Sequence, residues 1–318
     1  MKYEFAIFGL GISAKITSYL LAINGFSVCI ISDKDQKQEI SNTNLVTFLS
    51  RGSLHYLLSI FPNKKLFENN PAIDSIHCEL NSLRAKKFQS IKFDDEGKQH
   101  LGKIIKNIDF EKYLDNEISK LSNINIIYGS YPSLVTKTKD GIKLKLHNEE
   151  EIDSDLFILS SAKNNIADHL EVNFIKKDLE KEALSISVKG DIKNANSAFQ
   201  KFTSDGPLAL LPYSENEASI VWSLRRSSKL LYKDNIELLH DIDGHLSKYI
   251  SSIKIISYEK HKLQFVYAKN LVCKNTVLLG NIAHNIHPIA GQGLNLSIKD
   301  IATFVNQMIK YKSLGYKL

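Results

Sequence analysis

The chain has 318 residues and a formal net charge of +6; 43% of its residues are hydrophobic and 24% are charged. This composition excludes disordered, collagen-like and disulfide-scaffold proteins, and the length suits two domains of roughly 150 residues or one interrupted domain. The lysines are dispersed and no basic-aromatic module occurs, so nucleic acid is not an expected partner. Dispersed lysine is typical of a solvated surface; a weak attraction to anionic membranes is the alternative.

Targeting and redox features favour a reducing compartment. No apolar run reaches the ~18–20 residues that span a bilayer. Glu4 interrupts the first apolar stretch, which argues against a secretory signal peptide. Cys29, Cys78 and Cys273 are scattered, without the spacing of a disulfide framework or a metal site. We therefore expect a cytoplasmic protein with no metal.

The first thirty residues predict a strand, a helix and a second strand. Residues 3–8 are a short apolar strand. Apolar side chains recur at helical spacing over residues 14–24, and Gly25 suits the position that follows a helix. Residues 28–31 form a second apolar strand. This order is typical of a βαβ unit.

A glycine pattern lies between that strand and that helix. Gly9 and Gly11 allow a tight turn and a close approach to a pyrophosphate, and Ala14 is small enough for the helix to pack on the strand. Strand and helix flank the pattern as dinucleotide binding requires, although a purely structural turn is the alternative. At the end of the second strand, Asp33 is the candidate ribose ligand and Ser32 a weaker one.

The middle of the chain predicts alternating short elements. We expect a helix in the second half of residues 41–61, paired strands within 73–93, and a helix over 109–121. Four short strands follow, at residues 124–128, 133–138, 142–146 and 156–159. Asp140-Gly141 between two of them is a hairpin signal.

The last third predicts a mostly antiparallel sheet and then a return to the first domain. Expected strands lie at residues 183–188, 198–203, 208–212, 218–224, 253–258 and 263–267. One helix is expected over residues 236–250. A buried strand at 277–279 leads through a glycine-rich loop into a helix over 294–311. Because no linker separates these regions, the domains are predicted to be interleaved.

The second motif is more specific than the first. The run GNIAHNIHPIAGQGLNL at residues 280–296 places a proline and two glycines just before a helix, so free N–H groups point at an electron-rich acceptor. The runs FTSDGPLALLP at 202–212 and LGKIIKN at 101–107 accompany it. With these motifs the chain resembles the FAD-dependent ubiquinone-biosynthesis hydroxylases (the UbiH, UbiF and Coq6 group) of the para-hydroxybenzoate hydroxylase superfamily.

The resemblance implies an α/β fold in which a Rossmann-like FAD-binding domain is interleaved with a mostly antiparallel substrate domain. The FAD-binding domain is expected at residues 1–70, 97–180 and 270–318, and the substrate domain at 71–96 and 181–269. It also implies a reaction: NAD(P)H reduces FAD, O₂ adds to give a flavin C4a-hydroperoxide, and oxygen is transferred to a phenolic ring.

Site residues follow from the resemblance by position. Gly9, Gly11 and Ala14 would flank the pyrophosphate, and Gly280 and Asn281 would contact the ribityl-phosphate part. The residues expected against the isoalloxazine ring are Gly291, Gln292, Gly293, Leu294 and Asn295, and Pro288 is a further cofactor-binding candidate.

Two histidines of the same loop admit two interpretations. His284 and His287 are weak catalytic candidates, but bracing of the loop by hydrogen bonds is favoured. Their spacing in a proline-containing loop is poor metal geometry.

The sequence departs from the family at three places. Residues 42–50 lack the arginine that reaches the FAD phosphates, with Arg51 as a substitute further on. Ser161 stands where relatives carry Asp, and Asp168 falls near their Arg. The chain stops at Leu318, where relatives continue through further helices, so C-terminal helices are apparently missing.

The leading hypothesis is a monooxygenase that hydroxylates a polyprenylated phenol in ubiquinone biosynthesis. Its expected partners are the lipid-soluble substrate and O₂, with peripheral contact to the inner membrane and a ubiquinone-biosynthesis complex as further possibilities. Two alternatives stay open: a catalytically impaired flavoprotein-like scaffold, and a hydroxylase of another aromatic substrate. A dehydrogenase using NAD alone leaves the loop at 280–296 unexplained.

Overall fold

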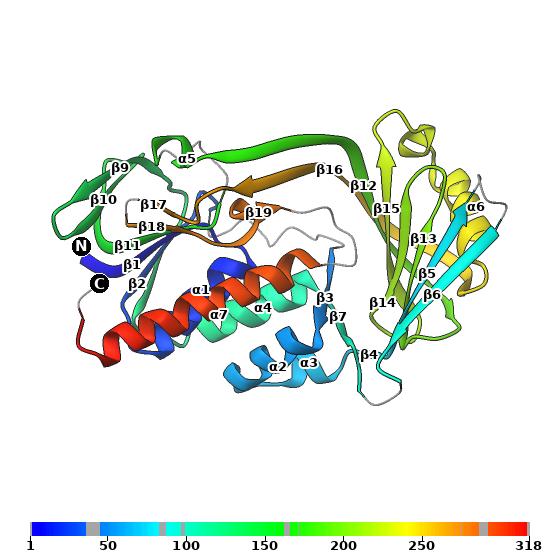
Figure 1. Ribbon diagram of the computed structural model, residues 1–318, viewed down its shortest axis with the longest axis horizontal. Helices are drawn as coiled ribbons and strands as arrows, with labels where there is room; N and C mark the ends of the chain where they lie inside the picture. Colours follow the sequence, from blue (N-terminus) through cyan, green and yellow to red (C-terminus); the bar gives the residue numbers. More distant parts are fainter. Residues whose placement is uncertain are drawn as a thin grey trace.

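Three sheets organise the molecule, and helices cover the two large ones (Figure 1). A computed structural model describes residues 2–35, 45–82, 87–96, 99–161, 166–170, 172–273, 275–285 and 292–316. The predicted fold is confirmed: a Rossmann-like parallel sheet is interleaved with a mostly antiparallel sheet.

The Rossmann-like sheet is built from buried apolar strands. Its strands are β1 (Lys2–Phe8), β2 (Val28–Ile31), β8 (Ile124–Ile127), β9 (Pro132–Thr138), β10 (Gly141–Leu146), β11 (Glu151–Leu159), β17 (Val272–Cys273) and β18 (Thr276–Leu278). The order β18-β11-β1-β2-β8 is parallel throughout, and β9 and β10 form the predicted hairpin beside β11. Both faces are buried over residues 5–8 of β1 and over all of β2, which is why these residues are apolar.

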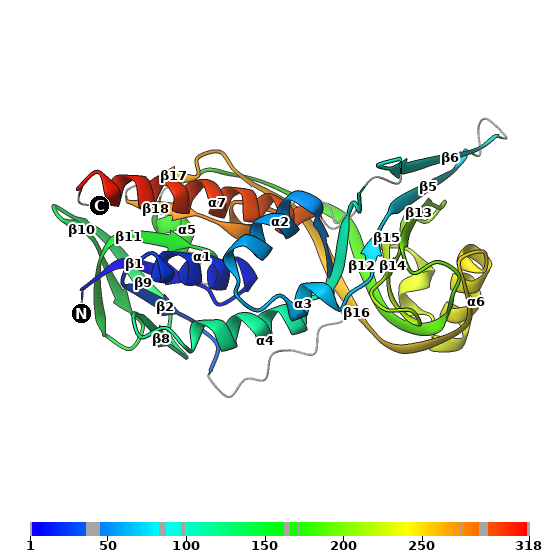
Figure 2. The same cartoon turned by 90° about the horizontal axis from the view of Figure 1, so that it is seen from below.

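Three long helices cover one face of this sheet (Figures 1 and 2). They are α1 (Ile12–Ile23), α4 (Asn107–Ile118) and α7 (Gln292–Ser313). Phe5 and Ile7 of β1 share one core with Ile16 of α1, Leu114 of α4 and Ile301 of α7. The alternate β1 side chains enter a second core on the other face, with β10 and the short helix α5 (Ile166–His169).

The second large sheet is mostly antiparallel. Its strands are β5 (Ser75–Ser82), β6 (Lys87–Asp94), β12 (Phe174–Ile192), β13 (Ser197–Phe202), β14 (Pro207–Pro212), β15 (Glu217–Arg225), β16 (Ile250–Ala268) and β19 (His284–Asn285). Their order is β19-β16-β12-β15-β14-β13-β5-β6, and the β13–β5 pair is parallel. Helix α6 (Asn235–Leu246), with the turn η2 (Lys229–Tyr232) before it, covers the outer face.

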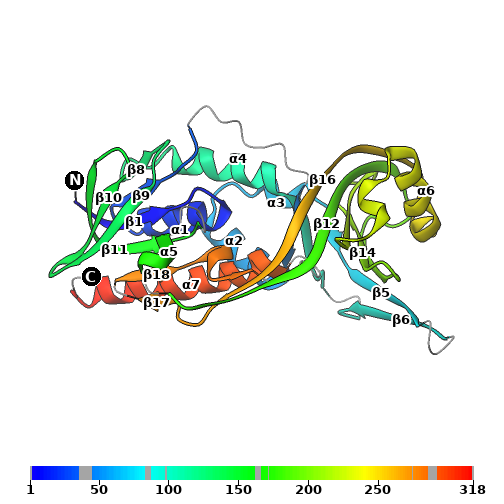
Figure 3. The same cartoon turned by 90° about the horizontal axis from the view of Figure 1, so that it is seen from above.

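Two 19-residue strands join the ends of the molecule (Figure 3). β12 and β16 pair from Phe174–Ala268 to Ile192–Ile250, with a register shift between Asp178 and Lys181 where Glu180 has φ +52°. The prediction of two strands at 253–258 and 263–267 was wrong, because one strand covers both. The alternation of Lys, Glu and His on this half-exposed ribbon weakened the hydrophobic signal between them.

A small third sheet and two helices lie between the large sheets. The small sheet holds β3 (Val46–Ser50), β4 (Ala72–Ile73) and β7 (Gly102–Lys106) in the order β3-β7-β4, and α2 (Arg51–Ile60) and α3 (Lys65–Glu68) follow β3. Strand β3 was not predicted. The helix predicted to reach residue 250 ends at Leu246, and Ile250 already belongs to β16.

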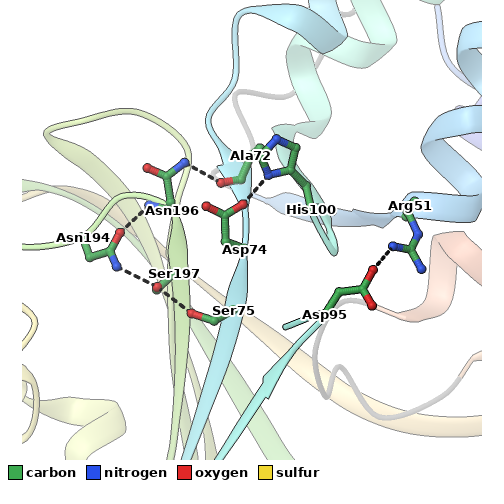
Figure 4. A network of polar contacts seen from close by, with 9 residues as sticks. All are labelled: Arg51, Ala72, Asp74, Ser75, Asp95, His100, Asn194, Asn196 and Ser197. Atoms are coloured by element: carbon green, nitrogen blue, oxygen red, sulfur yellow. Dashed lines mark hydrogen bonds and ion pairs between the residues drawn. The ribbon is translucent and has the colours of Figure 1, made fainter. Parts of the chain in front are cut away.

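Polar contacts fix the small sheet to the large antiparallel one (Figure 4). Asn196 Nδ2 donates to the carbonyl of Ala72 at 2.8 Å. Within the large sheet, Ser75 Oγ of β5 lies 2.8 Å from Ser197 Oγ of β13. Asp74 binds His100, which anchors the start of β5 to the segment before β7. The assignment of residue ranges to two domains stays a prediction.

Within the described residues, no helix is long and apolar enough to cross a membrane.

Candidate functional site

The turn between β1 and α1 has the geometry that its glycines predict. Gly9 has φ +123°, and a Cβ there would lie 3.2 Å from the Ser160 carbonyl carbon and 3.3 Å from Ser161 Cβ. A larger residue would therefore be strained and crowded. Ala14 is buried against the sheet, as the motif requires. The turn thus brings the start of α1 close to the end of β11.

The N-terminus of α1 opens into a cavity of about 300 Å³. Gly11 caps the helix without a side-chain hydrogen bond, so the first backbone N–H groups of α1 have no cap there. A Cβ at Gly11 would meet nothing within 4 Å. The lining residues are Gly11, Ile12, Ser13, Thr47, Asn107, Glu111, Ser160, Asn281 and Leu294. Thr47 Oγ1 donates to Asn107 Oδ1 at 2.7 Å, which joins β3 to α4 across the wall.

The charge of this cavity is unusual for a phosphate site. Of the lining residues in the described chain, Glu111 carries the formal charge, and none is basic. The buried Lys15 ammonium lies behind the wall, 2.8 Å from Asp115 Oδ1 and 3.7 Å from Glu111 Oε2. Arg51 pairs with Asp95 at 2.5 Å (Figure 4) and is not among the residues that line this cavity.

The two ribose candidates lie at the end of β2. Ser32 is buried, and its hydroxyl accepts the backbone N–H of Lys34 at 3.1 Å. Asp33 follows as a half-buried turn residue. Neither lines the cavity at α1. Their contact with an adenosine ribose remains a prediction.

The predicted ribityl contacts lie opposite α1, in the short turn η3 (Gly280–Ile282). Gly280 has φ +82°, and a Cβ there would lie 3.0 Å from Ser13 Cβ. Asn281 is exposed and lines the cavity at α1. The turn therefore faces the helix N-terminus at close range, and its contact with a ribityl-phosphate group stays a prediction.

His284, the loop histidine that the structure describes, connects the loop to α7 through a polar contact. His284 is buried, and its Nε2 lies 2.5 Å from Asp300 Oδ2 of α7. This contact ties the segment after η3 to α7. His284 Nδ1 is buried without a hydrogen-bond partner among the described residues. His287 lies outside the described residues, as do Pro288 and Gly291.

The start of α7 supports the site in a way that was not predicted. Asn295 Oδ1 accepts the N–H of Ser50 at 2.8 Å, and its Nδ2 donates to the Phe48 carbonyl at 2.6 Å. The amide therefore holds β3 against α7. Leu294 lines the cavity at α1. Gln292 is exposed and Gly293 is half-buried beside it.

A second cavity, of about 410 Å³, lies between the antiparallel sheet and the small sheet. Its walls are mainly apolar: Leu45, Val46, Phe48, Ile76, Ala183, Ala198, Phe199, Ala209, Leu211, Val221 and Leu263. Its polar lining comes from Ser185, Gln200, His261, Lys262, Gln264, Asn281 and Asn285. Asn281 lines both cavities, so the two meet at η3.

Sequence reasoning missed His261, which β16 places in the second cavity. Its Nε2 is buried without a hydrogen bond among the described residues, and lies 3.3 Å from Glu259 Oε2. Thr47 and Glu111 were missed for the same reason: no local motif marks them. Asn107 was quoted within the run at 101–107 without a role.

The region that departs from the family contacts the first cavity. Ser160 lines it, and its Oγ would lie 3.3 Å from a Cβ at Gly280. Ser161 packs on Gly9. Asp168 belongs to α5, and nothing is described of its side chain.

The residues of the first cavity fit the pyrophosphate of FAD. The uncapped N–H groups of α1 suit phosphate oxygens, and the open space at Gly11 is where a phosphate approaches the backbone. Charge compensation would come from these backbone groups, since the lining offers no basic side chain among the described residues. Gly280 and Asn281 would hold the next part of the cofactor.

Comparisons with known proteins agree with this geometry. No family model matches the chain. A 132-residue segment is 33% identical to 3-demethoxyubiquinol 3-hydroxylase of Escherichia coli (strain K12), covering 41% of this chain and 34% of that protein. A segment of 213 residues is 24% identical to the mitochondrial ubiquinone biosynthesis monooxygenase COQ6 of Drosophila melanogaster, covering 55% and 45%.

The chain is a distant homologue of the ubiquinone-biosynthesis hydroxylases. The aligned segments of this chain span about a third to a half of the first curated relatives' length, from 34% to 52%. Its fold matches p-nitrophenol 4-monooxygenase PnpA of Pseudomonas putida DLL-E4 with a TM-score of 0.79 at 10% identity, over 99% of this chain and 81% of that one.

A second solved neighbour contains the flavin. Aklavinone-11 hydroxylase, solved with FAD and aklavinone, matches this chain with a TM-score of 0.74 at 11% identity. The match covers 98% of this chain and 63% of that one.

Proposed function

We propose that the chain binds FAD across the two cavities and hydroxylates the ring of a polyprenylated phenol in ubiquinone biosynthesis. The observation that carries the proposal is the junction at Asn281, which lines both the cavity at α1 and the apolar cavity. A cofactor whose phosphates lie at α1 would extend past this residue to the mouth of the second cavity.

Each cavity supplies a different part of the chemistry. When bound, FAD reduced by NAD(P)H activates O₂ and supplies the oxygen atom. The chain's own residues position the substrate. The apolar walls of the second cavity exclude water from an aromatic ring.

His261 is the candidate for orienting the phenol. Its buried Nε2 is available to accept a hydrogen bond from a phenolic hydroxyl, which would otherwise be buried without a partner. His261 therefore has the position needed to hold the phenolic hydroxyl in the cavity.

The proposal also names the cofactor, the co-substrate and the place where the substrate is met. FAD is the resident cofactor and NAD(P)H the co-substrate, and a polyprenylated phenol would be met at the inner membrane. The proposal includes peripheral contact with that membrane, because the substrate is lipid-soluble, and contact with a ubiquinone-biosynthesis complex.

The test is turnover by the purified chain reconstituted with FAD. We expect NADH or NADPH oxidation to rise when 4-octylphenol is added under air, and the product mass to increase by one oxygen atom. Reconstituted protein that shows no flavin absorbance after desalting would refute FAD binding. Flavin retention with no product from several alkylphenols would refute hydroxylation alone.

One observation favours the alternative of a catalytically impaired scaffold. Glu111 places a carboxylate in the cavity where the phosphates would lie, and no basic side chain of the described lining faces the phosphates, although Lys15 outside the lining lies 3.7 Å from Glu111. A scaffold would bind FAD weakly and would not oxidise NAD(P)H in the presence of a phenol. The turnover experiment therefore separates the two functions.

A further inference from the structure

The hairpin of β5 and β6 projects from the edge of the antiparallel sheet (Figure 2). Directly opposite residues of two strands lie on the same face of a sheet, and successive residues alternate between faces. The register pairs Ile76 with Phe93 and Cys78 with Ile91. Leu80 continues the same face along β5.

This face of the hairpin is mainly apolar and open to solvent, with Gln89 opposite Leu80. Phe93 is 53% exposed, Ile91 58% and Leu80 43%. We call Ile76, Cys78, Leu80, Ile91 and Phe93 the hairpin strip. Contiguous exposed apolar side chains of this kind mark binding surfaces, whereas single ones do not.

The opposite face of the hairpin is polar and anchored. His77 stacks on Phe199 with ring centroids 5.2 Å apart, and Glu79 accepts the hydroxyl of Tyr249. The hairpin cannot rotate to bury the strip without breaking these contacts. Its exposure is therefore fixed by the sheet.

The strip is continuous with the wall of the apolar cavity. The parallel register pairs Ile76 with Ala198 and Cys78 with Gln200. Ile76, Ala198 and Gln200 all line that cavity. One face of the sheet thus runs from the cavity, through Ile76 and Cys78, to Leu80, Ile91 and Phe93 in solvent.

We propose that the hairpin strip binds the apolar tail of the substrate whose ring occupies the cavity. This inference rests on the proposed function, which places a phenolic ring in the cavity. The occupant is an alkyl or prenyl chain several carbons long, because the strip begins where the cavity wall ends. Its contact would cover side chains that water now surrounds.

Two phenols with the same ring and different tails test the proposal. Affinities of 4-ethylphenol and 4-octylphenol for the FAD-reconstituted chain are measured by calorimetry, below the micelle-forming range. Six added methylenes, half-buried on the strip, should tighten binding on the order of tenfold to a hundredfold. In Ile91→Gln/Phe93→Gln the tail advantage should fall below about threefold, since little apolar surface remains to bury.

Matched controls separate the strip from the hairpin as a whole. Ser90→Gln/Lys92→Gln changes the opposite face of the same strand and should keep the full tail advantage. Leu80→Gln, on the neighbouring strand, should lose part of it. Unchanged affinity for 4-ethylphenol in every variant shows that the cavity is intact, so a folding defect is recognised at once.

The outcomes are distinct. A tail advantage that survives in the double variant and in Leu80→Gln overturns the proposal, as does equal affinity of the wild type for both phenols. Strip variants that lose binding to phosphatidylglycerol-containing vesicles, while keeping the tail advantage, would assign the strip to a membrane and overturn it too. Tail-dependent binding without hydroxylation refutes the proposed reaction and leaves the strip supported.

Discussion

At the scale of single residues, a substitution at Gly11 should weaken cofactor binding and leave the fold intact. A valine there has free space around its Cβ and an extended backbone with φ −79°, so it disturbs no neighbour. Its side chain would fill the cavity in front of the α1 N–H groups. We expect Gly11→Val to lower FAD affinity at least ~100-fold, while the melting midpoint falls by no more than about 4 °C.

Fluorescence titration with FAD and thermal denaturation check this prediction. The control is Gly244→Val, at another glycine whose Cβ would meet nothing within 4 Å, on α6 and away from the cavity. FAD affinity should not change there. A Gly11→Val protein that binds FAD as the wild type does would show that the phosphates lie elsewhere.

His261 provides the second prediction at this scale. His261→Leu keeps a side chain of similar size but removes the buried Nε2 acceptor. We expect affinity for 4-ethylphenol to fall about tenfold, the cost of one unmade buried hydrogen bond. Affinity for its methyl ether, 4-ethylanisole, should not fall, because the ether has no hydroxyl proton. His240→Leu, at an exposed position of α6, is the control and should bind both ligands as the wild type does. Equal losses of affinity for 4-ethylphenol and 4-ethylanisole in His261→Leu would contradict the role of His261 as a hydrogen-bond acceptor.

His245 gives the chain a pH-dependent stability. Burial beside Trp222, and then the positive charge of Lys201, lower the pKa of His245 below its ordinary 6.5. Between the folded-state pKa and 6.5 the unfolded chain therefore binds more protons, and stability declines as pH falls through that window. We expect His245→Gln to reduce the loss of urea midpoint between pH 7.5 and 5.5. His240→Gln should leave that loss unchanged; an equal loss in His245→Gln would contradict the assignment.

Sequence reasoning found the site residues that carry a local motif. The tight turn at Gly9 follows from its glycine pattern, because it depends on neighbouring backbone; the close approach of Gly280 to Ser13 was not predicted, because it joins residues far apart in sequence. Thr47, Glu111 and His261 come from three separate elements that meet in space. Nothing in their local sequence distinguishes them from ordinary surface or strand residues.

At the scale of elements, α7 holds β3 through one side chain. Asn295→Ala leaves the N–H of Ser50 and the carbonyl of Phe48 without their partner at a largely buried position. We expect a loss of about 1–3 kcal/mol in the free energy of unfolding, measured by urea denaturation. Gln292→Ala, exposed at the start of the same helix, should change it by less than about 0.5 kcal/mol. Equal effects would show that β3 is held by other contacts.

Elements were predictable where their pattern was regular. The strand at 28–31 matches β2 at both ends, since its residues are apolar throughout. Strand β3 was missed because it is short and directly precedes the residues expected to be helical. The ribbon of β12 and β16 was divided because half of its side chains are polar, and its pairing joins residues far apart in sequence.

At the scale of the whole molecule, the interleaved order was predictable from the two motifs at opposite ends of the chain. The coupling between the large sheets was not, because it depends on β12 and β16 running unbroken from one to the other. Ala268 at the end of β16 donates its N–H to the Ala283 carbonyl beside the turn at Asn281. The site and the antiparallel sheet therefore share one continuous ribbon.

This continuity predicts that a ligand bound at one end stabilises the other. Trp222, the chain's one tryptophan, is buried in the antiparallel sheet on the face that α6 covers, so its fluorescence reports unfolding there. FAD at about 100 times its dissociation constant stabilises the protein by roughly 2.7 kcal/mol. For a chain of this length that is a rise of roughly 4 °C in the midpoint. We expect the midpoints of the Trp222 transition and of the far-ultraviolet circular dichroism transition to rise together.

Gly11→Val, which blocks the cofactor, should show neither rise. A Trp222 midpoint that stays fixed while the dichroism midpoint rises would mean that the sheets unfold independently and that the ribbon transmits no stability.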